Sequence, residues 1–297
     1  MVLREEQVHG LLRMEELIPA MRGALRDLSA NKVEQPMRLV LPVTEHEGFF
    51  AVMPACGGGA LGAKLVTFYP NNTGVPTHHA MILLFRPETG EPLVTMDGRL
   101  ITEMRTAAVS AVATDALARA NSSVLAILGS GVQARSHLEA MRLVREFREV
   151  RVWSPRNSKQ FCEQHNVSAA QSAEEATQGA DVIVVATAAT TPVLMGKWLS
   201  PGAHINAVGA TRPNWRELDD EVLRKARIYV ESREAAMKES GDVIAAGQVF
   251  AEIGEVVSGT KSGRESEEEI TLFKSVGVAV EDIATASLVY EKYLASR

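Results

Sequence analysis

A short glycine-rich run is the segment of this sequence whose residue types and spacing are most specific for one chemistry. The apolar residues 124–128 (VLAIL) lead into Gly129-Ser130-Gly131-Val132-Gln133-Ala134, and a helical pattern follows. In a strand–turn–helix context, the spacing GxGxxA is typical of dinucleotide binding. The first glycine permits the tight turn, the second lets the backbone approach a pyrophosphate, and the alanine lets the helix pack closely. The run therefore predicts a nucleotide site with contacts from Gly129, Ser130, Gly131, Val132 and Gln133.

The residues after the next predicted strand discriminate between the two nicotinamide cofactors. NAD-binding proteins usually carry Asp or Glu about 20 residues after the glycines, where the carboxylate holds the ribose 2′-hydroxyl. Here the strand 149–153 (EVRVW) is followed by Ser154-Pro155-Arg156-Asn157-Ser158-Lys159, which contains no carboxylate. An arginine can bind a 2′-phosphate in bidentate fashion. We therefore expect NADPH rather than NADH, with Ser154, Arg156 and Asn157 at the cofactor; the alternative is a solvated basic turn without a ligand.

The elements that must position these residues form a repeating pattern from residue 123 onward. Apolar runs at 124–128, 149–153, 181–185, 204–208 and 227–230 alternate with helical stretches. Continuous apolar strands separated by helices indicate a parallel sheet that is covered on both faces. The carboxyl ends of such strands line the cofactor crevice. We therefore expect Thr187 and Val208, at the ends of two of these strands, to contact the cofactor.

The residues before this region have a different texture. Short runs rich in Val, Leu and aromatic residues between 37 and 97 are separated by turn signals such as 57–59 and 71–74, which indicates a mainly antiparallel sheet. The alanine-rich stretch 99–120 predicts one long helix, and the residues after 274 predict a closing helix. An amphipathic helix is expected near the amino end, from the apolar positions between 12 and 28.

Together these patterns predict an α/β protein with a doubly wound, Rossmann-type parallel sheet domain and a discontinuous α+β domain. We expect residues 113–274 to form the dinucleotide-binding domain. Residues 1–112 and 275–297 are expected to form the substrate-binding and dimerisation domain.

Composition excludes several classes of function. The chain has 297 residues, a formal net charge of −6, and 46% hydrophobic residues, so intrinsic disorder and a general affinity for nucleic acid are not expected. No apolar run approaches the length of a membrane span. The two cysteines, Cys56 and Cys162, are too few for a disulfide framework or a cysteine zinc site. We expect a cytoplasmic protein without a metal.

The longer motifs resemble the ornithine cyclodeaminase/mu-crystallin family, and most closely its mu-crystallin branch. The resemblance extends from about residue 38 to residue 281 and rests on five motifs in the family's order. These are GAKLVTFYPNN, LVTMDGRLITEMRTAAVSA, ILGSGVQA, PGAHINAVGATRPNWRELDDE and FKSVGVAVED. The resemblance implies a homodimer in which sheets of two subunits associate, and it agrees with the two domains expected above.

The resemblance also implies a set of site residues. Arg38, Lys64 and Arg105 match the family's carboxylate-binding positions, and a bidentate arginine would fix the orientation of a substrate carboxylate. Thr77, His78, Lys274 and Ser275, together with Arg105, match positions near the nicotinamide. Trp215, Glu239 and Ser240 match residues around the substrate pocket, although Trp215 fits simple packing equally well. His78 or His79 are possible proton donors, and the sequence does not choose between them.

The activity implied is NADPH-dependent reduction of a cyclic ketimine carboxylate, of the Δ1-piperideine-2-carboxylate or Δ1-pyrroline-2-carboxylate type, with binding of thyroid hormone as a further property. The alternatives are an ornithine cyclodeaminase, an alanine dehydrogenase-like enzyme, or a non-enzymatic protein that binds NADPH and hormone or serves in the lens. Ornithine cyclodeaminases carry an Asp where this chain has Thr211. Because a threonine cannot act as a general base near neutral pH, ammonia elimination is the less favoured alternative.

Overall fold

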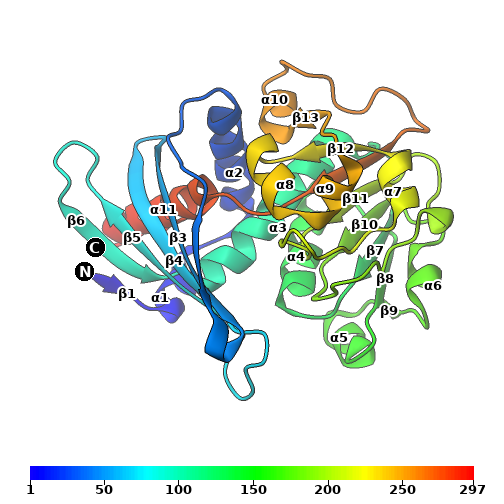
Figure 1. Cartoon of the computed structure of the whole chain (residues 1–297), viewed down its shortest axis with the longest axis horizontal. Coiled ribbons are helices and arrows are strands. Elements are labelled where there is room, and N and C mark those ends of the chain that lie inside the picture. The colour runs from blue at the N-terminus through cyan, green and yellow to red at the C-terminus, as the bar shows by residue number, and fades with distance from the viewer. The chain divides into compact units, whose positions relative to one another are not determined.

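The computed structural model describes residues 1–297, which form two compact units (Figure 1). The first unit comprises Met1–Arg105 and Gly277–Arg297, and the second comprises Thr106–Val276. The boundary between Arg105 and Thr106 falls inside the long helix α3 (Arg99–Leu117), whereas the sequence analysis expects it after residue 112. Helix α3 therefore begins in the first unit and continues into the second.

The first unit contains a six-stranded sheet in the order β1-β6-β5-β4-β3-β2. Its five antiparallel strands are β2 (Leu39–Val43), β3 (Gly48–Gly57), β4 (Ala60–Phe68), β5 (His78–Phe85) and β6 (Pro92–Asp97), as the sequence predicts. The short β1 (Val2–Leu3) adds a parallel edge strand beside β6. The helices of this unit are α1 (Glu5–Leu11), α2 (Met14–Ser29), the first turns of α3, and α11 (Ala279–Ala295).

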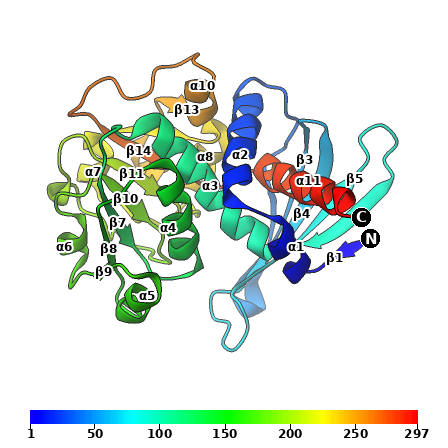
Figure 2. The ribbon, with the colours of Figure 1, turned by 180° about the vertical axis from the view of Figure 1, so that it is seen from behind.

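Helix α11 covers one face of this sheet, where it packs against β3, β4 and β5. Figure 2 shows α11 over that face, with α2 beside it. The covered face carries Met53, Lys64 and Ile82, which are neighbours in the register and are all buried. Because side chains alternate along a strand, the opposite face carries the intervening residues, among them Leu41 and Met81, and no helix of this unit covers them.

The second unit contains an eight-stranded sheet in which every pairing is parallel. The strands lie in the order β13 (Ala251–Glu252), β12 (Ala226–Val230), β14 (Ile270–Lys274), β11 (His204–Ala207), β10 (Val182–Val185), β7 (Val124–Leu128), β8 (Glu149–Trp153) and β9 (Ser168–Ala169). The chain leaves β7 toward β8 on one side and returns to β10 on the other. This reversal of strand order is where doubly wound sheets bind their ligands.

The helices of the second unit connect these parallel strands. They are α4 (Val132–Val144), α5 (Ser158–His165), α6 (Ala173–Thr177), α7 (Asp220–Lys225), α8 (Arg233–Glu239), α9 (Gly241–Ala246) and α10 (Ile253–Val257). Two of these helices have a side-chain N-cap: Ser172 accepts from the amide of Glu175 at the start of α6, and Asp219 accepts from that of Val222 at the start of α7. No helix of the chain is both long and apolar enough to cross a bilayer.

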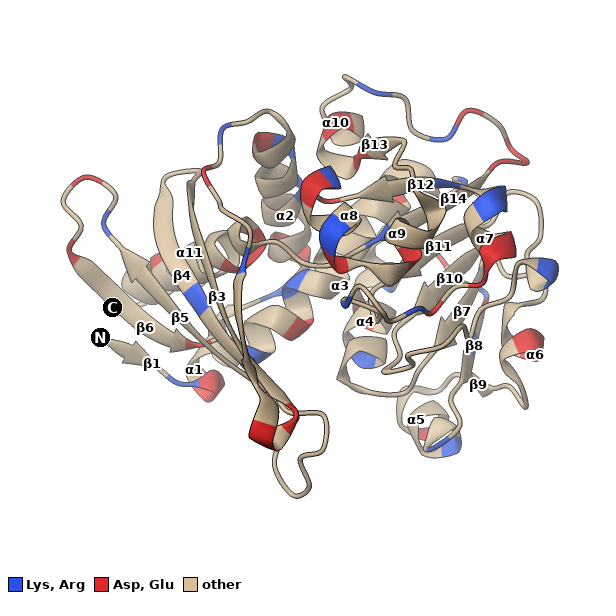
Figure 3. Cartoon of the chain, viewed as in Figure 1, with Lys and Arg blue, Asp and Glu red and all other residues tan.

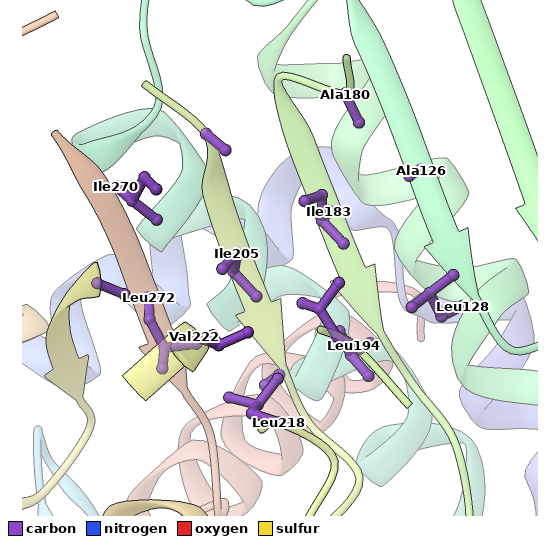
Figure 4. Close-up of a cluster of buried hydrophobic side chains, with 14 of the residues drawn as sticks. Ala126, Leu128, Ala180, Ile183, Leu194, Ile205, Leu218, Val222, Ile270 and Leu272 are labelled. Atoms are coloured by element: carbon purple, nitrogen blue, oxygen red, sulfur yellow. The ribbon is translucent and has the colours of Figure 1, made fainter. Parts of the chain in front are cut away.

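The core of the second unit is built by the strands themselves. Figure 4 shows Ile183, Ile205 and Leu272 projecting from neighbouring strands, with Leu194 and Leu218 packed nearby. All five side chains are fully buried. Figure 3 shows most charged residues in loops and on helices, and fewer on the strands. The apolar runs of the sequence thus predict this core because a parallel sheet buries both faces of its strands.

Two elements differ from the sequence-based expectation. The amino-terminal helix is broken at Leu12 and Arg13, which are extended, so that α1 and α2 are separate helices. Strand β14 was not expected, although its five residues are all buried and it lies between β11 and β12. This strand places Lys274 at the carboxyl edge of the sheet.

Candidate active site

The first unit gathers the three expected carboxylate-binding cations near the amino end of α11. Lys64 projects from the covered face of β4, Arg105 lies on α3, and Arg38 directly precedes β2. Arg38 donates to the carbonyl oxygen of Gly277 at 2.5 Å. Lys64 and Arg105 both contact Asp282, and Gly277, to which Arg38 donates, lies against the guanidinium of Arg105, so the three charges form one cluster.

Two carboxylates of α11 that the sequence analysis missed hold this cluster together. Asp282 Oδ2 lies 2.5 Å from Lys64 Nζ, and its Oδ1 accepts from Arg105 Nε at 3.0 Å. Glu281 Oε2 accepts from Arg105 NH1 at 2.7 Å. Both carboxylates are fully buried in the first turn of α11. The positive end of the helix dipole also stabilises their negative charge there. They belong to the recognised motif FKSVGVAVED, but local patterns do not reveal such distant partners.

The cluster carries a net positive charge, and its Lys64 and Arg105 side chains are buried. Burial lowers the pKa of Lys64 to about 8, with Arg105 and Arg38 acting in the same direction and Asp282 opposing them. Burial would raise the pKa of Asp282, but Arg105 and Lys64 outweigh it and hold that pKa below its usual range. The cluster contains three basic side chains and two acidic ones, so an additional anion would complete its charge balance.

His78 lies in the electrostatic field of the same cluster. Burial, followed by the charges of Lys64 and Arg105, lowers the pKa of His78 to about 4. The ring is therefore neutral near pH 7, and a neutral imidazole is a poor acid, which argues against His78 as the proton donor. Thr77, which precedes it, is exposed.

In the second unit, the glycine-rich turn has the geometry that its spacing predicts. Gly129 has φ of +124°, and a Cβ there would overlap the carbonyl oxygen of Ala186, so the fold itself requires glycine. Gly131, the N-cap of α4, is different: a Cβ at this position would meet nothing within 4 Å. The fold does not require glycine at 131, so the space beside the start of α4 is available for a ligand phosphate.

The turn is joined to the segment that follows β8. Ser130 Oγ lies 3.0 Å from both Ser154 Oγ and the carbonyl oxygen of Arg156. Arg156 is exposed, and Asn157 adopts a left-handed conformation with φ of 63° at the start of α5. The structure thus brings Ser130, Ser154 and Arg156 together at one end of the sheet.

The carboxyl ends of β10 and β11 meet at a buried carboxylate that the sequence analysis also missed. Glu217 accepts from the amide and hydroxyl of Thr187 and from the amides of Gly209 and Ala210. Lys274 Nζ lies 3.9 Å from Glu217 and 3.7 Å from Asp242, and all three side chains are fully buried. Burial raises the pKa of both carboxyls, and Lys274 opposes that effect. The charged end of Lys274 thus faces two carboxylates of the protein; its assignment to the cofactor stays a prediction.

The remaining predicted residues lie in the second unit. Val208 follows β11, and its amide donates to the carbonyl oxygen of Val185. Ser275 follows β14, and its amide donates to the carbonyl oxygen of Ala207. Trp215 and Glu239 are half-buried, and Ser240 caps α9 by accepting from the amide of Val243. The amide of Gly241 donates to Arg212, which places the loop of Trp215 beside Glu239 and Ser240. Their contacts with substrate, like the cofactor contacts above, stay predictions.

The chain is similar to known proteins over its whole length. The model of the ornithine cyclodeaminase/mu-crystallin family matches residues 1–297. Ketimine reductase mu-crystallin of Mus musculus is 51% identical over 98% of this chain and 96% of its own length.

Two solved structures are similar over the full chain. Δ1-pyrroline-2-carboxylate reductase of Thermococcus litoralis, in complex with NADH and L-proline, has a TM-score of 0.95 and 41% identity, covering 100% of this chain and 98% of that one. An archaeal alanine dehydrogenase dimer with bound NAD has a TM-score of 0.94 and 40% identity, covering 100% and 96%. By their names these three relatives are oxidoreductases: one is a ketimine reductase, one a Δ1-pyrroline-2-carboxylate reductase and one an alanine dehydrogenase.

Proposed function

We propose, from the premise that this chain belongs to the ornithine cyclodeaminase/mu-crystallin family, that it reduces cyclic ketimine carboxylates with NADPH. The substrates are of the Δ1-piperideine-2-carboxylate or Δ1-pyrroline-2-carboxylate type, and the products are cyclic amino acids. The relatives support reduction of a cyclic imine by a nicotinamide cofactor. The choice of NADPH rests on this chain's own residues.

The observation that carries this proposal is the cluster of Arg38, Lys64 and Arg105. Asp282 and Glu281 orient two of its cations and leave it with one more basic than acidic side chain. A single substrate carboxylate supplies the missing negative charge, and Arg105 and Lys64 offer it charge-assisted hydrogen bonds in a buried setting. Such a clamp fixes the ring of a small imine in one orientation. A fixed orientation is the main requirement for hydride transfer to the C=N carbon.

The second unit fits the cofactor. The open space at Gly131 and the amides at the start of α4 suit a pyrophosphate, and the exposed Arg156 after β8 suits a 2′-phosphate. When bound, the reduced nicotinamide supplies a hydride. A protonated imine is already electrophilic, so the chain's own residues need only orient the substrate and exclude water.

We propose that the protein is a homodimer that associates through the uncovered face of the first unit's sheet. Leu39, Leu41 and Met81 on that face are 70%, 58% and 49% exposed. The register places Leu39 and Met81 in line with Val52 and Leu65 of the strands between, and it pairs Leu41 with Phe50, so the apolar residues are continuous across the sheet. An apolar face of this kind is a typical association surface, and the alanine dehydrogenase relative is described as a dimer.

The decisive experiment is a parallel assay of purified protein. NADPH oxidation is followed with Δ1-piperideine-2-carboxylate and, separately, with Δ1-pyrroline-2-carboxylate; release of ammonia from ornithine is followed with NAD. We expect turnover only with the imines. The proposed function would be wrong if neither imine is reduced while NADPH binds.

Alanine dehydrogenase activity is the second candidate because an archaeal enzyme of that name shares the fold at 40% identity. It would also place a monocarboxylate in the cation cluster, but it needs ammonia. NADH or NADPH oxidation with pyruvate that depends on ammonia would favour it. Binding of thyroid hormone is a separate proposal that follows from the mu-crystallin relative alone, and titration with the hormone in the presence of NADPH tests it.

A further inference from the structure

Glu217 is a buried glutamate that joins the loops after two central strands of the second unit. Its Oε1 accepts from the amide of Thr187 at 2.9 Å and from the hydroxyl of that residue at 2.6 Å. Its Oε2 accepts from the amides of Gly209 at 2.7 Å and Ala210 at 3.0 Å. Thr187 follows β10, and Gly209 and Ala210 follow β11. One side chain therefore holds the carboxyl ends of two neighbouring strands.

The groups around Glu217 match an ionised carboxylate. All four hydrogen-bonding partners are donors, and an ionised carboxylate is purely an acceptor. Lys274 at the end of β14 supplies the counter-charge within 3.9 Å. Glycine at 209 is part of this fit, because a Cβ there would overlap Glu217 Oε1 and the carbonyl oxygen of Thr187.

A second carboxylate orients Glu217 in turn. Asp242, in the first turn of α9, accepts from the amides of Glu217 at 3.2 Å and Leu218 at 3.2 Å. The backbone that carries Glu217 is thus attached to α9, and its side chain to β10 and β11. The hydrogen-bonding partners of the two carboxylates are backbone amides and the hydroxyl of Thr187.

We propose that Glu217 is a positioning residue for the dinucleotide: it holds the loops after β10 and β11 in the shape that receives the cofactor. The inference rests on the proposed cofactor, since these loops lie at the carboxyl edge of the sheet, beside the strand that leads to the glycine-rich turn. Because Glu217 is fully buried and both of its oxygens accept from these loops, it acts through Thr187 and Gly209.

The test compares two carboxylates that clamp the same sheet at opposite ends. Glu217→Gln keeps the shape but turns an NH₂ donor toward donor groups. Asp181→Asn is the matched control, because Asp181 accepts from the amides of Ser123 and Val124 at 2.8 and 3.0 Å at the amino end of β7. Circular dichroism establishes the temperature at which each variant is folded, and NADPH fluorescence titration then measures Kd.

We expect NADPH Kd to rise at least tenfold in Glu217→Gln and to stay within twofold of the wild type in Asp181→Asn, even where both lose thermal stability. Folded Glu217→Gln with wild-type Kd would overturn the inference while leaving the proposed function intact. Equal weakening in both variants would also overturn it, because the effect would then follow stability alone. A wild-type protein that binds neither NADPH nor NADH would overturn the proposed function and this inference with it.

A second pair of variants covers the case in which Glu217→Gln does not fold. Asp242→Ala removes the oxygen that accepts from the amides of Glu217 and Leu218, and Asp242→Asn keeps it. We expect weaker NADPH binding in the alanine variant and recovery in the asparagine variant. Equal Kd values in the two would overturn the inference.

Discussion

Lys64 is the residue on which the substrate assignment depends most. Lys64→Met keeps the apolar stem but removes the charge that faces Asp282. We expect kcat/KM for the imine to fall 10²-fold or more, because a lost charge-assisted contact of about 3 kcal/mol corresponds to that factor. NADPH Kd should change little. Steady-state kinetics at saturating NADPH measure the effect, and near wild-type efficiency would remove Lys64 from the site.

The pairing of Lys64 with Asp282 requires a control for folding. Asp282 keeps its contact with Arg105 when the charge of Lys64 is removed, so Lys64→Met should stay folded. Thermal unfolding followed by circular dichroism checks this. A loss of kcat/KM at a near wild-type melting temperature separates loss of binding from loss of stability.

The pH dependence of kcat/KM follows from the same residue. Burial lowers the pKa of Lys64 from 10.5 to about 8. A lowered lysine pKa means that the charged form is lost as the pH rises through about 8, so kcat/KM should decline above that pH. Asp282 raises this pKa, so Asp282→Asn should move the decline to lower pH. An active Lys64→Arg variant should not show the decline, because arginine stays charged. A wild-type profile that is flat from pH 7 to pH 9 would contradict this expectation.

Arg156 tests the cofactor preference. It is exposed after β8, where no carboxylate is present to hold a ribose hydroxyl. We expect Arg156→Ala to weaken NADPH binding far more than NADH binding, because about 1.5–3 kcal/mol is lost with one charged contact. Competitive titration of both cofactors measures the ratio. Equal weakening of NADPH and NADH binding would contradict the assignment. A wild type that prefers NADH, the cofactor bound in the Thermococcus litoralis structure, would contradict it as well.

At the scale of elements, the two glycines of the turn between β7 and α4 have different roles: the fold requires Gly129, whereas Gly131 leaves space for a ligand. Gly131→Ala places a methyl group in open space, whereas Gly129→Ala combines φ of +124° with an overlap at Ala186. We expect Gly131→Ala to keep the melting temperature but raise the dinucleotide Kd at least tenfold. Gly129→Ala should lower the melting temperature itself. Thermal unfolding and cofactor titration of both variants provide the comparison, and unchanged affinity in Gly131→Ala would mean that no phosphate approaches there.

At the scale of the whole molecule, the uncovered sheet face predicts a dimer in solution. Leu41→Glu places a charge on that face, where Leu41 is 58% exposed. The matched control is Leu143→Glu on α4, where an apolar side chain is 44% exposed but lies in the second unit. Light scattering should show a dimer for the wild type and the control, and a smaller species for Leu41→Glu. A monomeric wild type at micromolar concentration would contradict the dimer.

The sequence by itself determined the features that depend on neighbouring residues. The run VLAILGSGVQA predicts strand, turn and helix because its apolar block, its glycines and its helix formers are contiguous. The N-caps Ser172 and Asp219 are equally local features, because a cap and the amide that it accepts from lie within one turn. The family's motifs located Arg38, Lys64 and Arg105.

The tertiary structure alone decided which groups these residues face. Arg105 and Asp282 are 177 positions apart, and no periodicity relates them. Glu217 lies in the charged run 216–221, which indicates a solvated helix start, yet its side chain is fully buried against Thr187 and Gly209. Strand β14 lies between β11 and β12. Its place in the sheet depends on strands that are distant in the sequence, so local patterns do not predict it. Local patterns record how a segment folds, whereas the partner of a buried charge is set by the elements that the whole fold brings beside it.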